Sequence, residues 1–161
     1  MDHLWSPWRF RYVNSGPSGE GCLFCSKGAE QPESGNLVVH RARHNFVILN
    51  LYPYNTGHLM VVPYEHVGTL SAAPAGTLSE MMSLTQTAER LLGGIYSPAG
   101  LNIGMNVGAC AGAGVAGHLH MHVVPRWLGD LNFMTVIGET RVSPEELDVT
   151  YGKIREAFEN V

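Results

Sequence analysis

The sequence predicts a single α+β domain built on a mainly antiparallel sheet, and three observations lead to this prediction. The chain has 161 residues, the length of one domain, and 45% of them are hydrophobic. Short β-type runs come first, one helix interrupts them, further strands follow, and a second helix ends the chain. Strands and helices do not alternate regularly, which disfavours a doubly wound parallel sheet.

The first half of the chain is expected to hold an arm and three strands. Residues 1–20 form the N-terminal arm, and residues 21–161 form the single domain. Runs of aliphatic and β-branched residues predict strands at 36–40, 46–49 and 59–62. The segment Tyr52–Gly57, rich in Pro, Asn and Gly, predicts the turn between the last two.

A helix is expected next, from Thr77 to Leu92. Thr77 and Glu80 have the spacing of a capping box, and Gly93-Gly94 is expected to end the helix. Its apolar residues recur at helical period, at Leu78, Met81, Met82, Thr85, Ala88 and Leu92.

The second half of the chain predicts two strands and a final helix. The strands are expected at 101–107 and 118–124, joined by a glycine-rich loop. The helix is expected to begin with Ser143 as its cap, Pro144 at its first position and Glu146 three residues after the cap. Its buried stripe comprises Leu147, Tyr151, Ile154 and Phe158.

Composition excludes several classes of function. The net charge of -4, without a block of like charge, argues against nucleic-acid binding through the phosphate backbone. No apolar run approaches the roughly 18 residues of a membrane span. The N-terminus lacks the apolar stretch of a signal peptide, so we expect a cytoplasmic protein that binds neither nucleic acid nor membrane.

Three histidines at alternate positions are the strongest chemical signal. In a strand, His118, His120 and His122 would share one face, and the apolar residues between them would enter the core. A polar outer face is one interpretation, and a metal site is another. The roughly 13 Å span of five strand residues is wide for one ion, although two histidines could share one. The third interpretation is nucleophilic catalysis, because a neutral imidazole has a free lone pair.

The glycine-rich loop before these histidines indicates the chemistry. Its glycines allow backbone N–H groups to converge on an anion, although such loops are also often merely flexible. A histidine nucleophile beside this loop favours attack on phosphorus through a phosphohistidine intermediate. The glycines are Gly108, Gly112, Gly114 and Gly117.

The run Gly117–Arg126 resembles the signature of the histidine-triad family of nucleotide hydrolases and transferases. The resemblance extends over Phe46–Asn50, Gly57–Pro63 and the central helix. The segments Trp5–Arg9 and Pro125–Asp130 are most similar to the bacterial diadenosine-polyphosphate branch, close to the fragile-histidine-triad type. The resemblance implies a five-stranded, mainly antiparallel sheet with two main helices, continued across a homodimer.

The resemblance also implies roles for individual residues. His120 is the expected nucleophile on the α-phosphorus, and His118 and His122 orient it and contact phosphate oxygens or the leaving group. Gly114 departs from the family pattern, because relatives usually carry Gln, Ser or Thr there. Either a backbone N–H replaces that side chain or assistance to the leaving group is weaker. The expected substrate contacts are Phe24, Ile48, Asn50, His58, Asn106, Gly114 and Trp127.

The residues themselves leave some of these roles open. Asn50 at the end of a strand is equally consistent with a turn residue, and His58 with a structural histidine. Asn106 is expected to contact phosphate or to fix the loop. Trp127 is expected to stack on a second base, whereas Trp5 and Trp8 have either this role or a dimer-packing one.

The pair Cys22 and Cys25 has the C-x₂-C spacing of a metal knuckle. In a reducing cytosol a metal site is favoured over a disulfide, and two reduced core cysteines are the alternative. The family resemblance implies that His66 and His118 complete a structural zinc site. Cys110 stands alone and has no evident catalytic partner.

Together these features predict an enzyme without an organic cofactor. It is expected to cleave dinucleoside polyphosphates, such as diadenosine tetraphosphate, through a nucleotidyl-histidine intermediate, with water or phosphate as acceptor. One alternative is a nucleoside phosphoramidase of the same family, and another is a non-catalytic AMP-binding sensor or adaptor.

Overall fold

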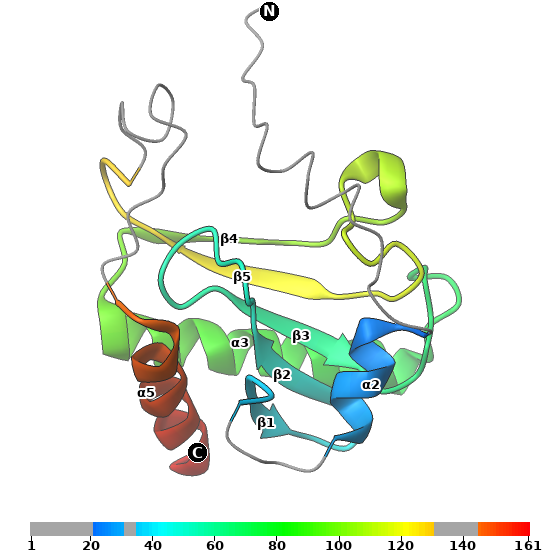
Figure 1. Ribbon diagram of the computed structural model, residues 1–161, viewed down its shortest axis with the longest axis horizontal. Coiled ribbons are helices and arrows are strands. Elements are labelled where there is room, and N and C mark those ends of the chain that lie inside the picture. The colour runs from blue at the N-terminus through cyan, green and yellow to red at the C-terminus, as the bar shows by residue number, and fades with distance from the viewer. Residues whose placement is uncertain (1–20, 31–34, 131–144) are drawn as a thin grey trace, which may run out of the picture.

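A five-stranded antiparallel sheet forms the centre of the molecule, in the order β1-β2-β3-β5-β4 (Figure 1). The computed structural model describes residues 21–30, 35–130 and 145–161. The strands are β1 (Val38–Arg41), β2 (Asn45–Leu49), β3 (Leu59–Pro63), β4 (Gly100–Gly104) and β5 (Met121–Arg126). The helices are α2 (Leu23–Ala29), α3 (Ala75–Tyr96), α5 (Leu147–Glu159) and a short 3-10 turn, η1 (Ala109–Ala111).

The helices cover the two faces of the sheet unequally. The long α3 and the C-terminal α5 pack on one face, where a large apolar cluster joins them to four strands (Figure 1). The short α2 supplies Phe24 to a second, smaller cluster that also contains Phe46 and Ile48. Alternation along β2 explains this division, because Val47 and Leu49 enter the larger cluster while Phe46 and Ile48 enter the smaller.

The predicted α+β class, five antiparallel strands and two main helices are confirmed. The apolar stripe predicted for α5 also packs into the larger cluster. The helix α2 is an addition, because the sequence suggested only a cysteine knuckle there. The arm at residues 1–20, including Trp5 and Trp8, lies outside the described residues, as do Ser143 and Pro144.

The predicted limits of α3 are wrong at both ends. The helix begins at Ala75, so Thr77 is buried inside it instead of capping it. It continues through Gly93-Gly94 and ends where Ser97 adopts a left-handed conformation, with its N–H bonded to the Gly93 carbonyl. Packing of the adjacent Leu92, which is fully buried, holds this last turn on the core. Of the predicted apolar positions Met82 is exposed.

The predicted start of α5 and end of β4 are also wrong. Glu146 has an extended backbone and α5 begins only at Leu147. The preceding Glu145 accepts hydrogen bonds from Tyr96 and Thr150, which hold the chain in a non-helical path. The strand β4 ends at Gly104.

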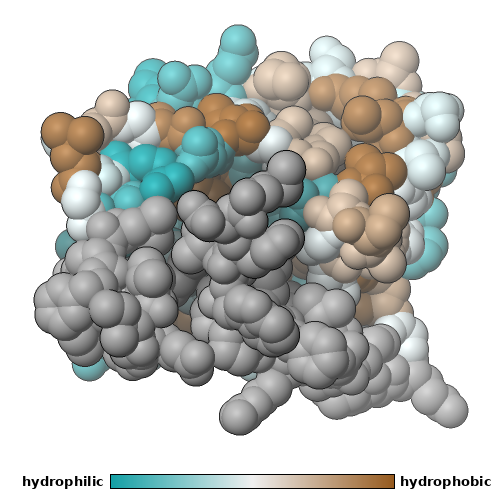
Figure 2. All heavy atoms as spheres, turned by 90° about the horizontal axis from the view of Figure 1, so that it is seen from above, coloured by the Kyte–Doolittle hydropathy of each residue, from teal (hydrophilic) through white to brown (hydrophobic). Residues whose placement is uncertain are grey.

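No helix in the described part of the chain is long and apolar enough to cross a membrane. The strand β4 lies at an edge of the sheet and carries the exposed Ile103. On the face seen from above, hydrophobic side chains are interspersed with hydrophilic ones (Figure 2). Continuation of the sheet across a homodimer stays a prediction.

Glu80, expected to cap its own helix, instead ties α3 to the turn between β1 and β2. Its carboxylate accepts hydrogen bonds from the N–H of His44 at 2.7 Å, from Asn45 Nδ2 at 2.8 Å and from the N–H of Arg43 at 3.2 Å. Burial raises the pKa of this carboxyl, but the hydrogen bonds outweigh burial, so its pKa lies below the ordinary value.

A Glu80→Gln substitution tests how much these hydrogen bonds stabilise the fold. Hydrogen bonds to a charged group favour the ionised, folded state, so the variant should lose about 1–2 kcal/mol of unfolding free energy at pH 7. Because the pKa of Glu80 is lower in the folded protein than its value of about 4.3 in the unfolded chain, the ionised carboxylate stabilises the fold at pH values above about 4.3. This stabilisation is lost as the pH falls through the folded pKa. Urea unfolding should therefore show a gap between wild type and variant that closes in acid. Glu89→Gln, exposed on the same helix, is the control.

Candidate functional site

The three alternate histidines do not share one strand, which corrects the prediction. Only His122 lies in β5, whereas His118 and His120 precede it. The ladder between β3 and β5 ends at the pair Val61 and Met121. Beyond it, Pro63 has no N–H to donate, and its carbonyl accepts a hydrogen bond from His118 Nε2 at 2.8 Å. Leu119, Met121 and Val123 are buried as predicted, and so are His118 and His120.

His120 uses one ring nitrogen for a hydrogen bond to the backbone, and its other ring nitrogen is the candidate nucleophile. Its Nδ1 lies 2.9 Å from the carbonyl oxygen of His118, which can only accept, so Nδ1 carries the proton. The lone pair is then on Nε2. Burial lowers the pKa of His120, and the carbonyl bond only partly opposes this shift, so the ring is neutral at pH 7.

His122 belongs to a chain of two imidazoles. The backbone N–H of Tyr54 donates to His58 Nδ1 at 3.1 Å, so the proton of a neutral His58 is on Nε2. That Nε2 donates to His122 Nδ1 at 2.9 Å. The proton of a neutral His122 is consequently on its Nε2. The rings of His120 and His122 lie edge to face, with centroids 4.8 Å apart.

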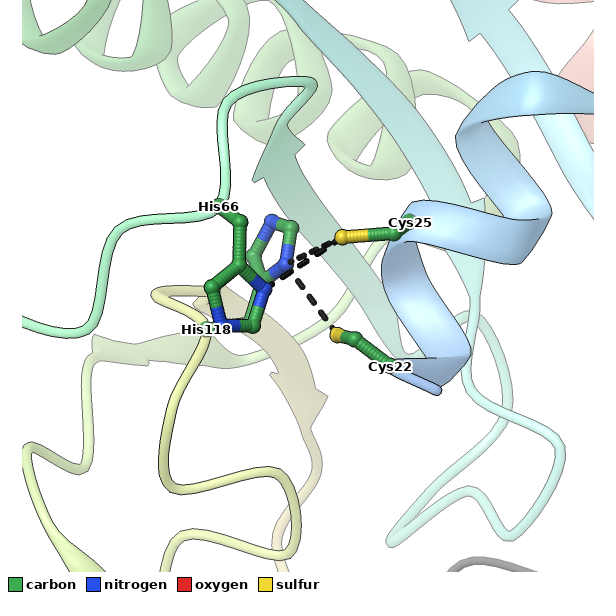
Figure 3. Close-up of side chains that lie close together, drawn as sticks. All are labelled: Cys22, Cys25, His66 and His118. Atoms are coloured by element: carbon green, nitrogen blue, oxygen red, sulfur yellow. Dashed lines mark hydrogen bonds between the residues drawn. The ribbon is translucent and has the colours of Figure 1, made fainter. Parts of the chain in front are cut away.

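The ring of His118 lies in a cluster of metal-ligand residues (Figure 3). The donor atoms of Cys22, Cys25, His66 and His118 all lie within 4.8 Å of one another. The cysteines come from α2, His66 from the loop after β3, and His118 from the loop before β5. The C-x₂-C spacing predicted the two cysteines, and the family resemblance implied the two histidines.

Three donor-atom separations in this cluster match those around a tetrahedral ion. His118 Nδ1 lies 3.3 Å from Cys22 Sγ and 3.6 Å from Cys25 Sγ, and His66 Nδ1 lies 3.3 Å from Cys25 Sγ. Bonds of about 2.3 Å to sulfur and 2.0–2.1 Å to nitrogen put the ligands of tetrahedral zinc about 3.3–3.8 Å apart. His118 presents a lone pair at Nδ1, because Nε2–H is donated to Pro63.

The protonation of these groups follows from their surroundings. Burial is the main cause that lowers the pKa of His118, and the neighbouring His66 and His120 add to it. Burial and the adjacent Cys22 raise the pKa of the Cys25 thiol. A bound metal would have to displace the thiol proton of Cys25.

The other predicted contacts divide into neighbours of the triad and remote residues. Phe24, which is 4% exposed, lies 5.0 Å from the His120 ring and 5.5 Å from the His118 ring, between centroids. Ile48 packs in the same apolar cluster as Phe24. His58 contacts His122 directly.

The remaining candidates lie in turns and loops. Asn50 Oδ1 accepts a hydrogen bond from the Tyr52 N–H, as a turn residue does. Asn106 Nδ2 donates to the Gly112 carbonyl at 3.5 Å, which fixes the glycine-rich loop that also contains the exposed Gly114. Trp127 follows β5, five residues or roughly 16 Å of strand beyond His122, so the structure does not bring it to the triad.

Sequence reasoning missed two members of the site. The ring of Tyr54 lies 4.7 Å from His58 and 6.1 Å from His122, between centroids. Its place in the Pro- and Asn-rich turn before His58 was the available signal. The carbonyl of Pro63 left no signal, because any residue has one.

Comparisons with known proteins place the sequence and the fold among known families. A family model described as "HIT domain" matches residues 31–127. The chain is 40% identical over 154 residues to a Mycobacterium tuberculosis protein named "AP-4-A phosphorylase", covering 91% of this chain and 79% of the relative. It is similar to a solved "ZN-bound histidine triad family protein" from Mycobacterium smegmatis, with 28% identity and a TM-score of 0.70. The match covers 87% of this chain and 94% of that protein. A "hypothetical histidine triad nucleotide-binding protein" from Sulfolobus tokodaii has 29% identity and a TM-score of 0.69. The match covers 86% of this chain and 93% of that protein.

The hydrogen bonds predict the tautomer of each ring. In folded protein at about pH 8, His120 should carry its proton on Nδ1, and His58 and His122 on Nε2, because each partner's polarity is fixed. Long-range ¹H–¹⁵N spectra of histidine-labelled protein distinguish the two tautomers. The urea-unfolded chain serves as the reference, and a proton on Nε2 of folded His120 would contradict the assignment.

Proposed function

The chain belongs to the HIT domain family, and on this premise we propose that it cleaves dinucleoside polyphosphates such as diadenosine tetraphosphate. The observation that carries the proposal is the neutral His120, whose Nδ1–H is bound to a carbonyl and whose Nε2 lone pair is available. Support from outside the site is the likeness to the protein named "AP-4-A phosphorylase".

The first step forms a nucleotidyl-histidine. The lone pair of His120 Nε2 attacks the α-phosphorus, and the bond from that phosphorus to the bridging oxygen breaks. His122, whose ring lies beside that of His120, donates a hydrogen bond from its Nε2–H to the polyphosphate, which departs as an anion. The carbonyl of His118 stabilises the positive charge that develops on the ring of His120.

The second step returns the enzyme to its starting state. A water molecule, which loses a proton to solvent, or an inorganic phosphate anion attacks the same phosphorus, and the bond to His120 Nε2 breaks. With diadenosine tetraphosphate, the first step releases ATP, and the second yields AMP from water or ADP from phosphate. The name of the Mycobacterium tuberculosis relative, "AP-4-A phosphorylase", favours phosphate as the acceptor.

In this scheme His58 positions His122, which donates a hydrogen bond to the leaving group. It is 1% exposed and receives the Tyr54 N–H at one nitrogen, so its other nitrogen can only donate to His122. This contact keeps His122 Nδ1 unprotonated and holds the proton of His122 on Nε2, from which it can bond to the leaving group. Substitution of His58 would remove that control.

We also propose that Cys22, Cys25, His66 and His118 hold a structural zinc ion. The ligand spacing and the donor set support the proposal. When bound, zinc supplies a cross-link between α2 and the two loops that carry the histidines. Both ring nitrogens of His118 then have partners, so we assign the contact with phosphate to His122. The role of His118 toward the nucleophile is to hold His120 through the backbone carbonyl of His118.

The assignment of the nucleophile is tested with His120→Ala. The variant should lose at least about a thousandfold in turnover of diadenosine tetraphosphate, because no other group can form the covalent intermediate. Nucleotide affinity should change little. His44→Ala, a histidine in the turn between β1 and β2, is the control.

Product analysis in the same experiment separates the alternatives. ADP that forms only with added phosphate indicates a phosphorylase, and AMP plus ATP without phosphate indicates a hydrolase. An acid-labile mass adduct on the wild-type His120 supports the intermediate. Full turnover by the alanine variant would refute the assignment, and tight AMP binding without turnover by the wild type would indicate a sensor or adaptor.

Zinc content is expected to be about one ion per chain, because the four donors complete one tetrahedral site. Elemental analysis of purified wild type and of Cys22→Ser measures it, and the variant should retain much less metal. Cys110→Ser, which changes an exposed cysteine outside the cluster, is the control. A stable wild-type protein without metal would overturn the zinc proposal and leave the proposed cleavage standing.

A further inference from the structure

The helix α2 carries two of the four cluster residues, yet it is too short to be stable by itself. It has seven residues, with Cys22 at its N-cap and Cys25 in its first turn, and no side chain caps its N-terminus. Isolated helices of this length are unstable in water, so tertiary contacts must hold it. The position of the two thiols therefore depends on what holds α2.

Arg41 at the end of β1 holds the C-terminal end of α2. Its Nη1 donates to the Gly28 carbonyl at 2.7 Å, and its Nη2 donates to the carbonyls of Lys27 at 3.2 Å and Glu30 at 2.6 Å. The carbonyls of Lys27 and Gly28 belong to the last turn of α2 and that of Glu30 to its C-cap, where no further helical N–H is available to them. One side chain thus satisfies three carbonyl groups.

The charge of Arg41 is compensated by the helix end itself. Among the described residues, no carboxylate forms an ion pair with Arg41, whereas the neighbouring Glu30 pairs with Lys27 at 2.9 Å. The C-terminus of a helix carries partial negative charge, which favours a cation there. The planar guanidinium also reaches several acceptors at once, which the single ammonium group of a lysine cannot do as well.

Two further contacts set the distance between α2 and the sheet. Phe24 is buried in the smaller apolar cluster, between the two cysteines in sequence. A Cβ on Gly28 would lie 3.2 Å from carbon atoms of Phe46 and Tyr64, so this glycine permits close approach. Phe46 is paired with Arg41 in the sheet, so packing and the cap act at one place.

We propose that Arg41 is a positioning residue for the metal centre: by capping the last turn of α2 from the sheet, it holds Cys22 and Cys25 opposite His66 and His118 before the ion binds. This inference rests on the proposed zinc site. Preformed ligands lose less conformational entropy on binding, so the cap raises metal affinity without touching the ion.

The test is metal affinity in Arg41→Met, measured with full-length protein. Chelator competition gives the Zn²⁺ affinity, and the visible spectrum of the Co²⁺-loaded protein reports thiolate ligation. We expect affinity about tenfold weaker or more, the range seen when residues supporting metal ligands are lost. Lys27→Met is the matched control, because it removes an ion pair on the same helix without touching the cap.

Two additional measurements separate positioning from general stability. Arg41→Lys should recover part of the lost affinity, because an ammonium can still bond to a terminal carbonyl. The melting temperature of the metal-free variants should fall much less than that of the zinc-loaded variants. If Arg41→Met fails to fold, the comparison is made with Arg41→Lys, whose affinity should lie below that of wild type.

The outcomes are decisive in both directions. Unchanged Zn²⁺ affinity in folded Arg41→Met or Arg41→Lys would overturn the proposal, as would an equal loss in Lys27→Met. A wild type that binds neither Zn²⁺ nor Co²⁺ would overturn this proposal and the zinc site together. Turnover of diadenosine tetraphosphate, measured separately, tests the proposed cleavage independently.

Discussion

The site depends on one constraint: His118, His120 and His58 each bond through one ring nitrogen to a backbone group whose polarity cannot change. A backbone carbonyl can only accept, and a backbone N–H can only donate. The carbonyl of His118 therefore fixes the proton of His120 on Nδ1, and the N–H of Tyr54 fixes that of His58 on Nε2. His120 as nucleophile and His122 as hydrogen-bond donor to the leaving group are thus fixed before any substrate arrives. Burial also keeps His120 neutral.

His118 connects this arrangement to the cysteine cluster. Its carbonyl holds His120, its Nε2–H is donated to Pro63, and its Nδ1 faces the thiols. Displacement of the His118 ring would shift the carbonyl on the same residue. The cluster therefore has a structural reason to lie beside the nucleophile although it contacts no reacting atom. Phe24, on the cysteine-bearing helix and against His120, makes a second connection between the two.

Sequence patterns predicted the sheet, its two main helices and the members of the histidine and cysteine clusters. They did so because alternation, C-x₂-C spacing and the family signature are local features. The limits of α3 depended on tertiary packing, which carried the helix past Gly93-Gly94. Glu80 was assigned to its own helix because sequence spacing cannot reveal the three donors from the turn between β1 and β2. Likewise, no residue type identifies the carbonyls that Arg41 caps.

The one wrong prediction about the triad explains how the triad works. If β5 began at His118, the carbonyls of His118 and Pro63 would be candidates for ladder hydrogen bonds within the sheet. Instead β3 and β5 separate after Val61 and Met121, and the Leu119 N–H bonds to the Val67 carbonyl at 2.7 Å. Both carbonyls then accept ring N–H groups. A strand would align three imidazoles, whereas this departure from the sheet assigns each a different partner, and with it a different role.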